Sequence, residues 1–226
     1  MAECQWRFPD ALTAEPSGVV AFGADLAPET LVHAYRSGIF PWPHSGTPLP
    51  WFSPDPRGVL FLDRLRVTRS LRQRLRGCGW SATVDVAFEA VVAACAERPG
   101  EGTWINRSMR QAYGRLHELG WAHSVEVWDG DELVGGLYGV RVGACFTGES
   151  MFHHRPDASK SALVELVDRW GEAGGELIDV QIATEHLAGL GAVELGRPEF
   201  LGRLARMRDR LTCIAVERRE VSRLVR

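Results

Sequence analysis

The sequence predicts an α/β fold in which a mixed β-sheet carries helices on both faces. Two observations support this prediction. From residue 58 onward, segments with the alternating pattern of strands are interspersed with segments of helical periodicity. The chain of 226 residues, with 45% hydrophobic and 24% charged residues, is also long and apolar enough to bury a sizeable core.

Residues 1–57 differ from the rest of the chain because proline, glycine and aromatic residues are abundant in them. Residues 38–57, GIFPWPHSGTPLPWFSPDPR, hold six of the twelve prolines. One helix is expected over residues 28–37, because proline suits its first turn and the glycine that follows suits its end. We therefore expect a small N-terminal α+β domain over residues 1–57 and a main α/β domain over residues 58–226.

The larger domain is expected to begin with strands at residues 58–62 and 80–84 and a helix over residues 85–98. One face of that helix is expected to hold Phe88, Val91, Val92 and Cys95. A second helix, over residues 106–120, begins with Asn106 as a capping residue and ends at a glycine. Its apolar side is expected to hold Met109, Ala112, Tyr113, Leu116 and Leu119.

An antiparallel meander and four further elements complete this domain. Residues 123–152 contain an Asp-Gly turn between strand-like segments, which favours antiparallel pairing. The remaining elements are a helix over 158–174, a strand over 176–183, a short helix over 184–191 and a helix over 197–211. This order of elements is typical of a transferase domain of the N-acetyltransferase type.

Composition and charge exclude several classes of protein. The formal net charge of −3 gives no general attraction to nucleic acid or anionic membranes, so a polyanion would need a local basic patch. No apolar run approaches the ~20 residues of a membrane span, and the N-terminus lacks a signal-peptide pattern. Five scattered cysteines without a C-x-x-C pair indicate reduced thiols and no zinc site. We expect a cytoplasmic protein without a metal.

Two acidic positions are candidates for catalysis. In ELIDVQIA, strand alternation places Asp179 and Gln181 on one face together with Leu177. The surrounding apolar residues favour an internal strand, where an unpaired carboxylate would be costly; a solvated strand edge is the alternative. Glu149 follows a glycine near the end of a predicted central strand, so it is expected to face a cleft, with an ordinary turn carboxylate as the alternative.

An arginine-rich segment at residues 64–76 is a candidate phosphate-binding surface. It carries six arginines and no acidic residue in a chain that is acidic overall. A helix starting after Thr68 would cluster Arg69, Arg72 and Arg76 on one face, at ~100° per residue. A charged helix face is often merely solvated, but the lack of acidic residues favours phosphate binding here.

The sequence indicates no nucleotide cofactor. Enzymes of the N-acetyltransferase type hold the pyrophosphate of acetyl-CoA at a helix N-terminus, in a stretch spelled [RQ]-x-x-G-x-[GA]. No such stretch precedes the helix expected at residue 158. The GGLYG segment lacks the following lysine and hydroxyl residue of an ATP-binding loop. We therefore expect the enzyme to work without a cofactor.

Six motifs taken together resemble those of bacterial leucyl/phenylalanyl-tRNA–protein transferases. They are FGADLAPETLVHAYRSGIFPW, WFSPDPRGVL, GTWINRSMRQAYGRLHELGWAHSVEVW, GGLYGV, GESMF and LIDVQ. The similarity runs from about Phe8 to Met207, with the motifs in the family's order. That family moves Leu or Phe from aminoacyl-tRNA to the N-terminal Arg or Lys of a protein and so marks the protein for degradation through the N-end rule.

The resemblance implies a fold, partners and an oligomeric state. The C-terminal part would be a GNAT-like domain of the acyl-CoA N-acyltransferase superfamily, with a small N-terminal domain packed against it. Leu-tRNA and Phe-tRNA would be donors, with Met as a further transferred residue, and proteins with N-terminal Arg or Lys would be acceptors. The enzyme would be a monomer. An acyl group that arrives on tRNA would explain the missing acetyl-CoA cradle.

The resemblance also implies catalytic and nucleotide-contacting residues. The family's catalytic Asp and Gln match Asp179 and Gln181, and its active-site Glu matches Glu149. Its aromatic residues at the 3′-terminal adenosine match Trp42 and Trp104. The prolines around Trp42 would hold its loop rigid, so that a terminal base could stack on the indole ring.

Two further groups of residues follow from the resemblance. The pocket for the transferred side chain matches Leu137, Phe146 and Leu166. The family has Met in place of Leu137 and Phe in place of Leu166, which bears on the preference among Leu, Phe and Met. The family's basic cluster for tRNA matches Arg69, Gln73 and Arg76, and Arg72 adds a positive charge beside the neutral Gln73.

Aminolysis of an activated ester requires mainly that a neutral amine be held against the carbonyl carbon. An α-amino group with a pKa of ~7.7–8.0 is partly neutral at cytoplasmic pH. We hypothesise that Asp179 orients the acceptor amine and helps to deprotonate it, and that Gln181 positions the reacting groups. Glu149 would add negative charge that favours acceptors with Arg or Lys.

Two alternative functions use parts of the same pattern. A GNAT-type N-acyltransferase for small molecules or proteins would share the fold, but it should also show a phosphate cradle for acetyl-CoA. A non-catalytic RNA-binding module would use the arginines and aromatic residues. It would leave Asp179, Gln181 and Glu149 without a role.

Overall fold

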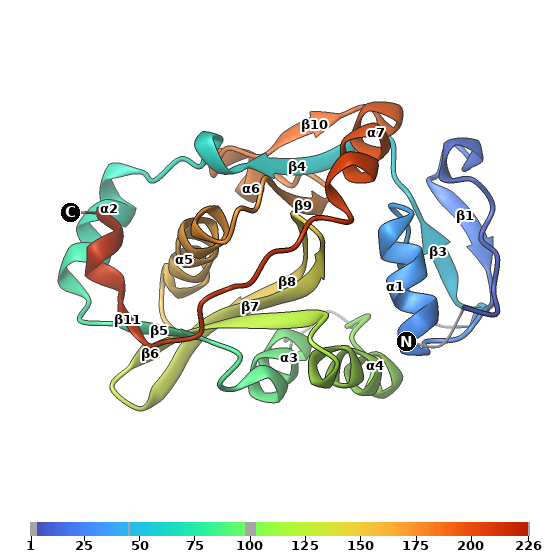
Figure 1. The fold of residues 1–226 in the computed structure, drawn as a ribbon. Coiled ribbons are helices and arrows are strands. Elements are labelled where there is room, and N and C mark those ends of the chain that lie inside the picture. The colour runs from blue at the N-terminus through green and yellow to red at the C-terminus, as the bar shows by residue number, and fades with distance from the viewer. Residues whose placement is uncertain (1–3, 45, 98–102, 226) are drawn as a thin grey trace.

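A large mixed β-sheet forms the centre of the molecule (Figure 1). The computed structural model describes residues 4–44, 46–97 and 103–225. Among the described strands the order is β10-β4-β9-β8-β7-β6-β5-β11, and only β8 and β9 pair in parallel. These strands span Arg57–Phe61 (β4), Ser81–Val84 (β5), Ala122–Asp129 (β6), Glu132–Val142 (β7), Cys145–His153 (β8), Leu177–Gln181 (β9), Val193–Leu195 (β10) and Arg219–Glu220 (β11).

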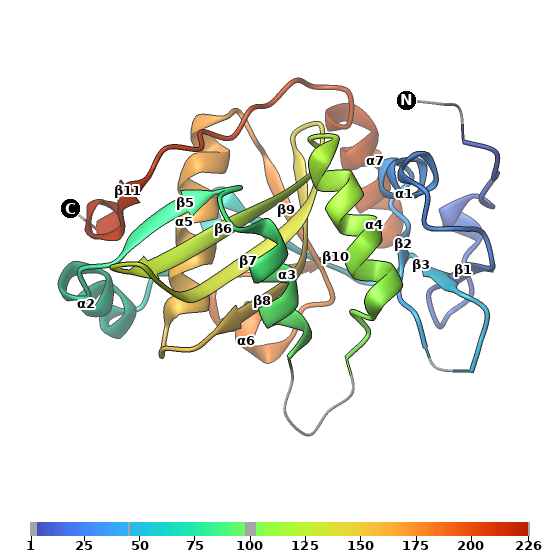
Figure 2. The ribbon, with the colours of Figure 1, turned by 90° about the horizontal axis from the view of Figure 1, so that it is seen from below.

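Helices cover both faces of this sheet, as the predicted α/β class requires. α5 packs on one face, and α3 and α4 pack on the other (Figures 1 and 2). The helices span Pro28–Arg36 (α1), Arg69–Gly77 (α2), Phe88–Ala96 (α3), Arg107–Glu118 (α4), Ala158–Glu172 (α5), Glu185–Gly189 (α6) and Arg197–Met207 (α7). Each helix expected from the sequence is present; residue 98, the expected end of one of them, lies outside the described residues.

Side-chain caps explain where two of these helices begin. The Thr68 hydroxyl accepts a hydrogen bond from the Leu71 N–H (3.2 Å), and the Asn106 side chain accepts one from the Met109 N–H (3.0 Å). The expectation that Leu119 lies on the buried side of α4 is wrong. Leu119 is the C-cap residue and is 52% exposed, because the chain leaves the helix axis there.

A second, smaller sheet lies beside α1 at the N-terminal end of the molecule (Figure 1). Its strand order is β1-β3-β2, and the strands span Val19–Phe22, Pro50–Phe52 and Phe40–Pro41, respectively. The buried side chains of Leu31 and Tyr35 on α1 belong to the same hydrophobic core as Tyr113 of α4. The small α+β unit therefore shares a core with the large sheet, and the domain boundary at residue 57 stays a prediction.

Short strands are the elements that the sequence pattern did not predict. β10 and β11 have three and two residues, and each pairs antiparallel with a longer neighbour, β4 and β5. Segments this short carry no measurable alternation, so their conformation is set by hydrogen bonds to the neighbouring strand rather than by their own residues.

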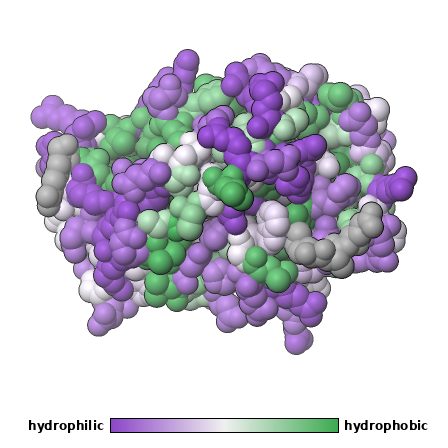
Figure 3. Space-filling view, viewed as in Figure 1, coloured by the Kyte–Doolittle hydropathy of each residue, from purple (hydrophilic) through white to green (hydrophobic). Residues whose placement is uncertain are grey.

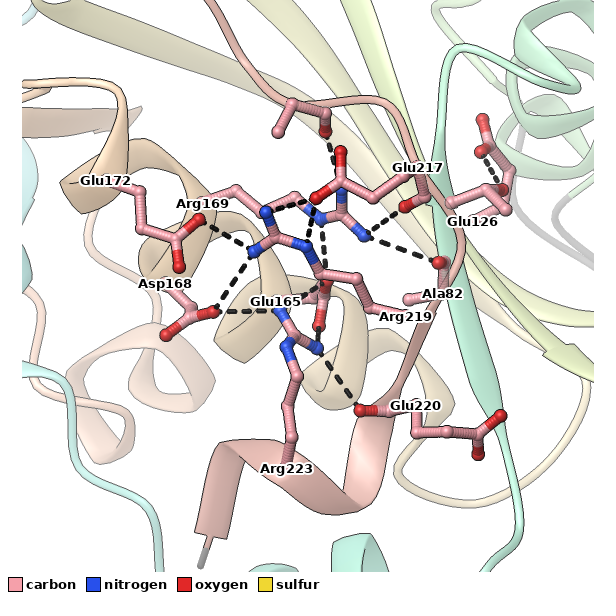
Figure 4. A network of polar contacts seen from close by, with 12 residues as sticks. Ala82, Glu126, Glu165, Asp168, Arg169, Glu172, Glu217, Arg219, Glu220 and Arg223 are labelled. Atoms are coloured by element: carbon pink, nitrogen blue, oxygen red, sulfur yellow. Dashed lines mark hydrogen bonds and ion pairs between the residues drawn. The ribbon is translucent and has the colours of Figure 1, made fainter.

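A network of charged residues holds the C-terminal segment against α5 (Figure 4). Arg169 and Glu165, both on α5, are fully buried, and the Arg169 Nε donates to Glu165 (2.6 Å). Arg169 also donates to the backbone carbonyl of Glu217, while Arg223 donates to both oxygens of Glu165 (2.7 and 2.8 Å). The chain end is thereby fixed beside α2, where Figure 1 shows it.

Polar residues cover most of the face seen in Figure 3, and apolar residues appear there as separate patches. In the described part of the chain, no helix combines the length and apolar character needed to cross a bilayer.

Candidate active site

A cavity opens where the parallel strands β8 and β9 separate. The two strands pair from Cys145 to Thr147 opposite Leu177 to Asp179, and β8 then continues without β9. Beyond this point lies a cavity of about 370 Å³. Its lining residues are Phe40, Pro41, Trp42, Trp104, Glu149, Ser150, Met151, Val180, Gln181, Ile182, Thr184, His186 and Leu187.

Glu149 is aimed into this cavity by a β-bulge. In the pairing of β7 with β8, Tyr138 lies opposite Ser150 and Gly139 lies opposite Gly148, so Glu149 has no partner residue. A bulged residue leaves the alternation of its strand and can turn its side chain toward a site. Glu149 is the one acidic residue among the described residues that line the cavity.

Three donors converge on the Glu149 carboxylate. The Tyr35 hydroxyl of α1 donates to Oε1 (2.8 Å) and the Tyr113 hydroxyl of α4 donates to Oε2 (2.7 Å). The Gln181 Nε2 of β9 also donates to Oε1 (3.0 Å). Elements from both parts of the molecule thus hold a single carboxylate, which fixes its position before any substrate binds.

Burial raises the pKa of Glu149 to about 7, although the hydrogen bonds from both tyrosines act in the opposite direction. Burial and the nearby Glu149 charge raise the pKa values of Tyr35 and Tyr113 well above that of a free tyrosine. The tyrosines therefore stay protonated as donors. Glu149 can gain or lose a proton near neutral pH, which suits a group that exchanges protons with an amine.

The raised pKa of Glu149 predicts that protein stability falls as the pH rises. An ordinary glutamate in the unfolded chain ionises near pH 4.5, whereas the folded protein keeps this proton until about pH 7. The contribution of Glu149 is therefore fully present below pH 4.5 and is lost as the pH rises through 7. We expect the free energy of unfolding of the wild type, measured with urea, to fall between pH 5 and pH 8 by on the order of 1–3 kcal/mol more than that of Glu149→Gln. If the free energy of unfolding changed with pH in the same way in both proteins, the raised pKa of Glu149 would be contradicted.

Gln181 occupies an unusual backbone conformation at the end of β9. Its φ of 64° lies in the left-handed region, which side chains other than glycine rarely adopt. Its N–H donates to Asp179 Oδ1 (2.9 Å), and this bond holds the turn that sends the Gln181 side chain toward Glu149. On the neighbouring strand, a Cβ at Gly58 would lie 2.5 Å from the Ala183 nitrogen, so only glycine permits this close approach.

Asp179 lies behind the cavity rather than in it. Its side chain is 2% exposed, and its carboxylate accepts two hydrogen bonds from Arg57, from Nε to Oδ1 (2.8 Å) and from Nη2 to Oδ2 (2.6 Å). Thr147 donates to the same carboxylate (3.3 Å). This arrangement does not favour the hypothesis that Asp179 orients and deprotonates the acceptor amine, because Arg57, Thr147 and the Gln181 N–H already donate to its two oxygens. Through Oδ1, the same carboxylate accepts the hydrogen bond from the Gln181 N–H.

A smaller apolar pocket, of about 130 Å³, adjoins Glu149 and Gln181. Leu137 and Leu166 line it as expected, and its other lining residues are Tyr138, Gly148, Ser150, Met151, Leu163, Ile178, Val180 and Leu187. Phe146 is fully buried behind it and packs edge-on against Trp170, with ring centroids 5.7 Å apart. Phe146 is not among the described residues that line this pocket or the larger cavity.

The two expected tryptophans lie on the wall of the larger cavity. Trp42 follows β2 and packs edge-on against Phe52, with ring centroids 5.7 Å apart. Trp104 lies just before α4 and packs edge-on against Tyr113, with ring centroids 6.5 Å apart. Both indoles are partly exposed, so each retains a face that a ligand could contact.

The arginine-rich helix forms as the sequence predicted, but it lies away from this cavity at the other end of the sheet (Figure 1). Arg69, Arg72 and Arg76 are exposed, and the leucines of the opposite face are buried. Arg76 donates to the Val225 carbonyl (3.1 Å), so part of its hydrogen-bonding capacity is used within the protein.

Sequence reasoning missed Arg57, Tyr35 and the site role of Tyr113. Arg57 stands in WFSPDPRGVL, directly before the apolar residues of a predicted strand. A charged residue at such a position indicates a buried side chain that needs a partner of opposite charge. Tyr113 lies on the buried, apolar side of α4, as the sequence predicts, and its hydroxyl also donates a hydrogen bond to Glu149. Nothing in the sequence pairs Tyr35 with residues far along the chain.

Comparison with known proteins identifies the class of the protein. A family model described as leucyl/phenylalanyl-tRNA protein transferase matches residues 59–205, and the model of that family's N-terminal domain matches residues 24–55. The chain is thus an aminoacyltransferase. It belongs to the leucyl/phenylalanyl-tRNA–protein transferase family.

Curated members of this family are similar in sequence to this chain over most of its length. The leucyl/phenylalanyl-tRNA–protein transferase of Anaeromyxobacter dehalogenans (strain 2CP-C) is 54% identical over 208 residues, which cover 91% of this chain and 89% of the relative. That of Yersinia pestis (strain Pestoides F) is 50% identical, covering 88% and 84% of the two chains. Among solved structures, L-PGS from Bacillus licheniformis is similar with a TM-score of 0.44 and 12% identity, covering 76% of this chain and 67% of that one.

Proposed function

We propose that this enzyme transfers Leu or Phe, and also Met, from aminoacyl-tRNA to the N-terminal Arg or Lys of acceptor proteins, on a GNAT-like fold. The observation that carries the proposal is the position of Glu149, between an apolar pocket and a larger cavity walled by two tryptophans. The product would carry a new N-terminal residue that marks the acceptor for degradation through the N-end rule.

The apolar pocket supports the donor side of the proposal. Its leucine and isoleucine walls favour an uncharged aliphatic or aromatic side chain, because each buried CH₂ stabilises binding by about 0.8 kcal/mol. A pocket of this kind discriminates weakly among apolar side chains of similar size. Trp42 and Trp104 would hold the terminal adenosine, since a base stacked on an aromatic ring contributes about 1–3 kcal/mol.

Glu149 and Gln181 support the acceptor side. The amine nitrogen would attack the ester carbonyl carbon, the bond from that carbon to the ribose oxygen would break, and the amine proton would pass to the ribose oxygen. Glu149, with a pKa of about 7, can attract a cationic acceptor and accept the amine proton before returning it to the leaving oxygen. Gln181 would position the reacting groups, held in place by Asp179 and Arg57.

A transfer assay tests this proposal directly. Purified enzyme is mixed with labelled Phe-tRNA or Leu-tRNA and peptides that differ only in an N-terminal Arg, Lys or Ala. We expect labelled product with the Arg and Lys peptides and little with the Ala peptide. Transfer from acetyl-CoA with none from aminoacyl-tRNA would instead assign the protein to the N-acetyltransferases.

The exposed arginines of α2 are proposed to bind the body of the tRNA. Arg69 and Arg72 have no side-chain partner among the described residues, so both can contact phosphates. We expect Arg69→Ala and Arg72→Ala each to weaken tRNA binding. Each should also make the slope of log binding constant against log salt concentration less negative, by up to about 0.9. Binding is measured at several salt concentrations, with Arg203→Ala, which breaks an exposed pair with Glu199 on α7, as the control for lost charge. Slopes equal to that of the control would contradict this role.

A further inference from the structure

A third cavity, of about 480 Å³, lies between the arginine-rich helix and the candidate active site. It shares Met151 and His186 with the wall of the larger active-site cavity. Its lining residues are Met151, His153, Pro156, Asp157, Ser159, Lys160 and His186. In Figure 2, α2, the segment between β8 and α5, and α6 follow one another along one edge of the molecule.

Ion pairs connect this third cavity to the arginine-rich helix. Asp157, in front of α5, accepts a hydrogen bond from Lys160 Nζ (2.8 Å) and lies 3.9 Å from Arg74 Nε of α2. The one acidic side chain among the described lining residues is thus paired with two cations, and the His153 and His186 rings lie on the same wall as possible hydrogen-bond donors. Burial, followed by the charges of Lys160 and His153, lowers the pKa of His186 and so favours its neutral form, in which one ring N–H can still donate a hydrogen bond to a phosphate.

Lys160 is unusual in the composition of this chain. Of the 26 lysine and arginine residues, it is the single lysine. Arginine therefore serves at every other cationic position, yet the compact ammonium group occurs at the wall of this cavity. An ammonium is a compact point charge with three donors, so it suits a contact with a single phosphate group.

We propose that Lys160, with His153 and His186 beside it, binds backbone phosphates of the unpaired 3′ end of the donor tRNA. This inference rests on the proposed function, since the donor strand would run from α2 through the third cavity to the active site. The acceptor does not fit here, because its N-terminal Arg or Lys would be repelled by the same cations. His186 and Met151 line both cavities, so a strand whose terminal adenosine contacts Trp42 has a continuous path from the larger cavity into the third one.

Chemical protection of Lys160 tests the contact without any transfer reaction. Because the chain has one lysine, reductive methylation read by mass spectrometry reports on this side chain, with the α-amino group as an internal reference. We expect Phe-tRNA to slow methylation of Lys160 at least fivefold and phenylalanyl-adenosine, which lacks the preceding phosphates, to slow it little. Equal methylation with and without Phe-tRNA would overturn the proposal.

Variants of Lys160 provide the second measurement. For each enzyme, kcat/KM is measured with Phe-tRNA and with phenylalanyl-adenosine, and we expect Lys160→Met to lower the ratio of the first value to the second at least fivefold. The same substitution should make the slope of log tRNA-binding constant against log salt concentration less negative by about 0.7. Lys160→Arg should restore most of the ratio, and Arg203→Ala serves as the control for lost charge. A ratio for Lys160→Met equal to that of the control would overturn the site. Absence of transfer from either donor would overturn the proposed function, while protection of Lys160 by tRNA would still support the binding site.

Discussion

Arg57→Met is expected to lower the free energy of unfolding by about 3–5 kcal/mol and to reduce transfer below detection. The substitution leaves the buried Asp179 carboxylate without the two hydrogen bonds that neutralise it. It also removes the donor to the Gly38 carbonyl and the cation stacked between Phe40 and Phe200. Urea unfolding at pH 7 measures the stability, and the peptide transfer assay measures the activity.

A double variant separates the role of the ion pair in stability from its role in the site. Replacing a buried ion pair with apolar residues of similar size is often neutral for stability. We therefore expect Arg57→Met with Asp179→Leu to recover much of the lost stability. Transfer should stay at least 100-fold below wild type, since Gln181 loses the acceptor of its N–H. A stable double variant with wild-type transfer would show that Asp179 has no positioning role.

Glu149→Gln is expected to lower kcat/KM for an Arg-terminated peptide by about 10²- to 10⁴-fold, the range of general acid–base catalysis. The amide keeps the size of the side chain but cannot take a proton from the amine or pair with a cationic acceptor. The loss should be smaller for an Ala-terminated peptide, which has no cation for Glu149 to attract. Single-turnover transfer from Phe-tRNA at several peptide concentrations measures both effects.

Two controls make the Glu149 result interpretable. Glu194→Gln removes an exposed carboxylate on β10 and should leave transfer at the wild-type rate. Tyr113→Phe removes one of the three donors to Glu149 while the carboxyl group remains, so a loss smaller than that of Glu149→Gln is expected. Wild-type transfer by Glu149→Gln would exclude this residue from the reaction.

Regular elements could be predicted because their signals are local. The cap residues Thr68 and Asn106 and the apolar stripes of α3 and α4 depend on neighbours within one or two helical turns. The family motifs also brought Trp42, Trp104, Glu149 and Gln181 into one hypothesis, and the structure places all four around a single cavity. Strands of two or three residues had no such local signal.

The sequence by itself determined the α/β class, the order of the main elements and the family. It could do so because periodicity, capping and motif order are properties of consecutive residues. Only the tertiary structure decided which carboxylate faces the cavity. Asp179 and Glu149 are equally polar in the sequence, but Arg57, 122 residues away, encloses Asp179, while a β-bulge turns Glu149 outward. Contacts between distant segments and a local break in strand pairing leave no periodic trace, so side-chain environment had to come from the fold.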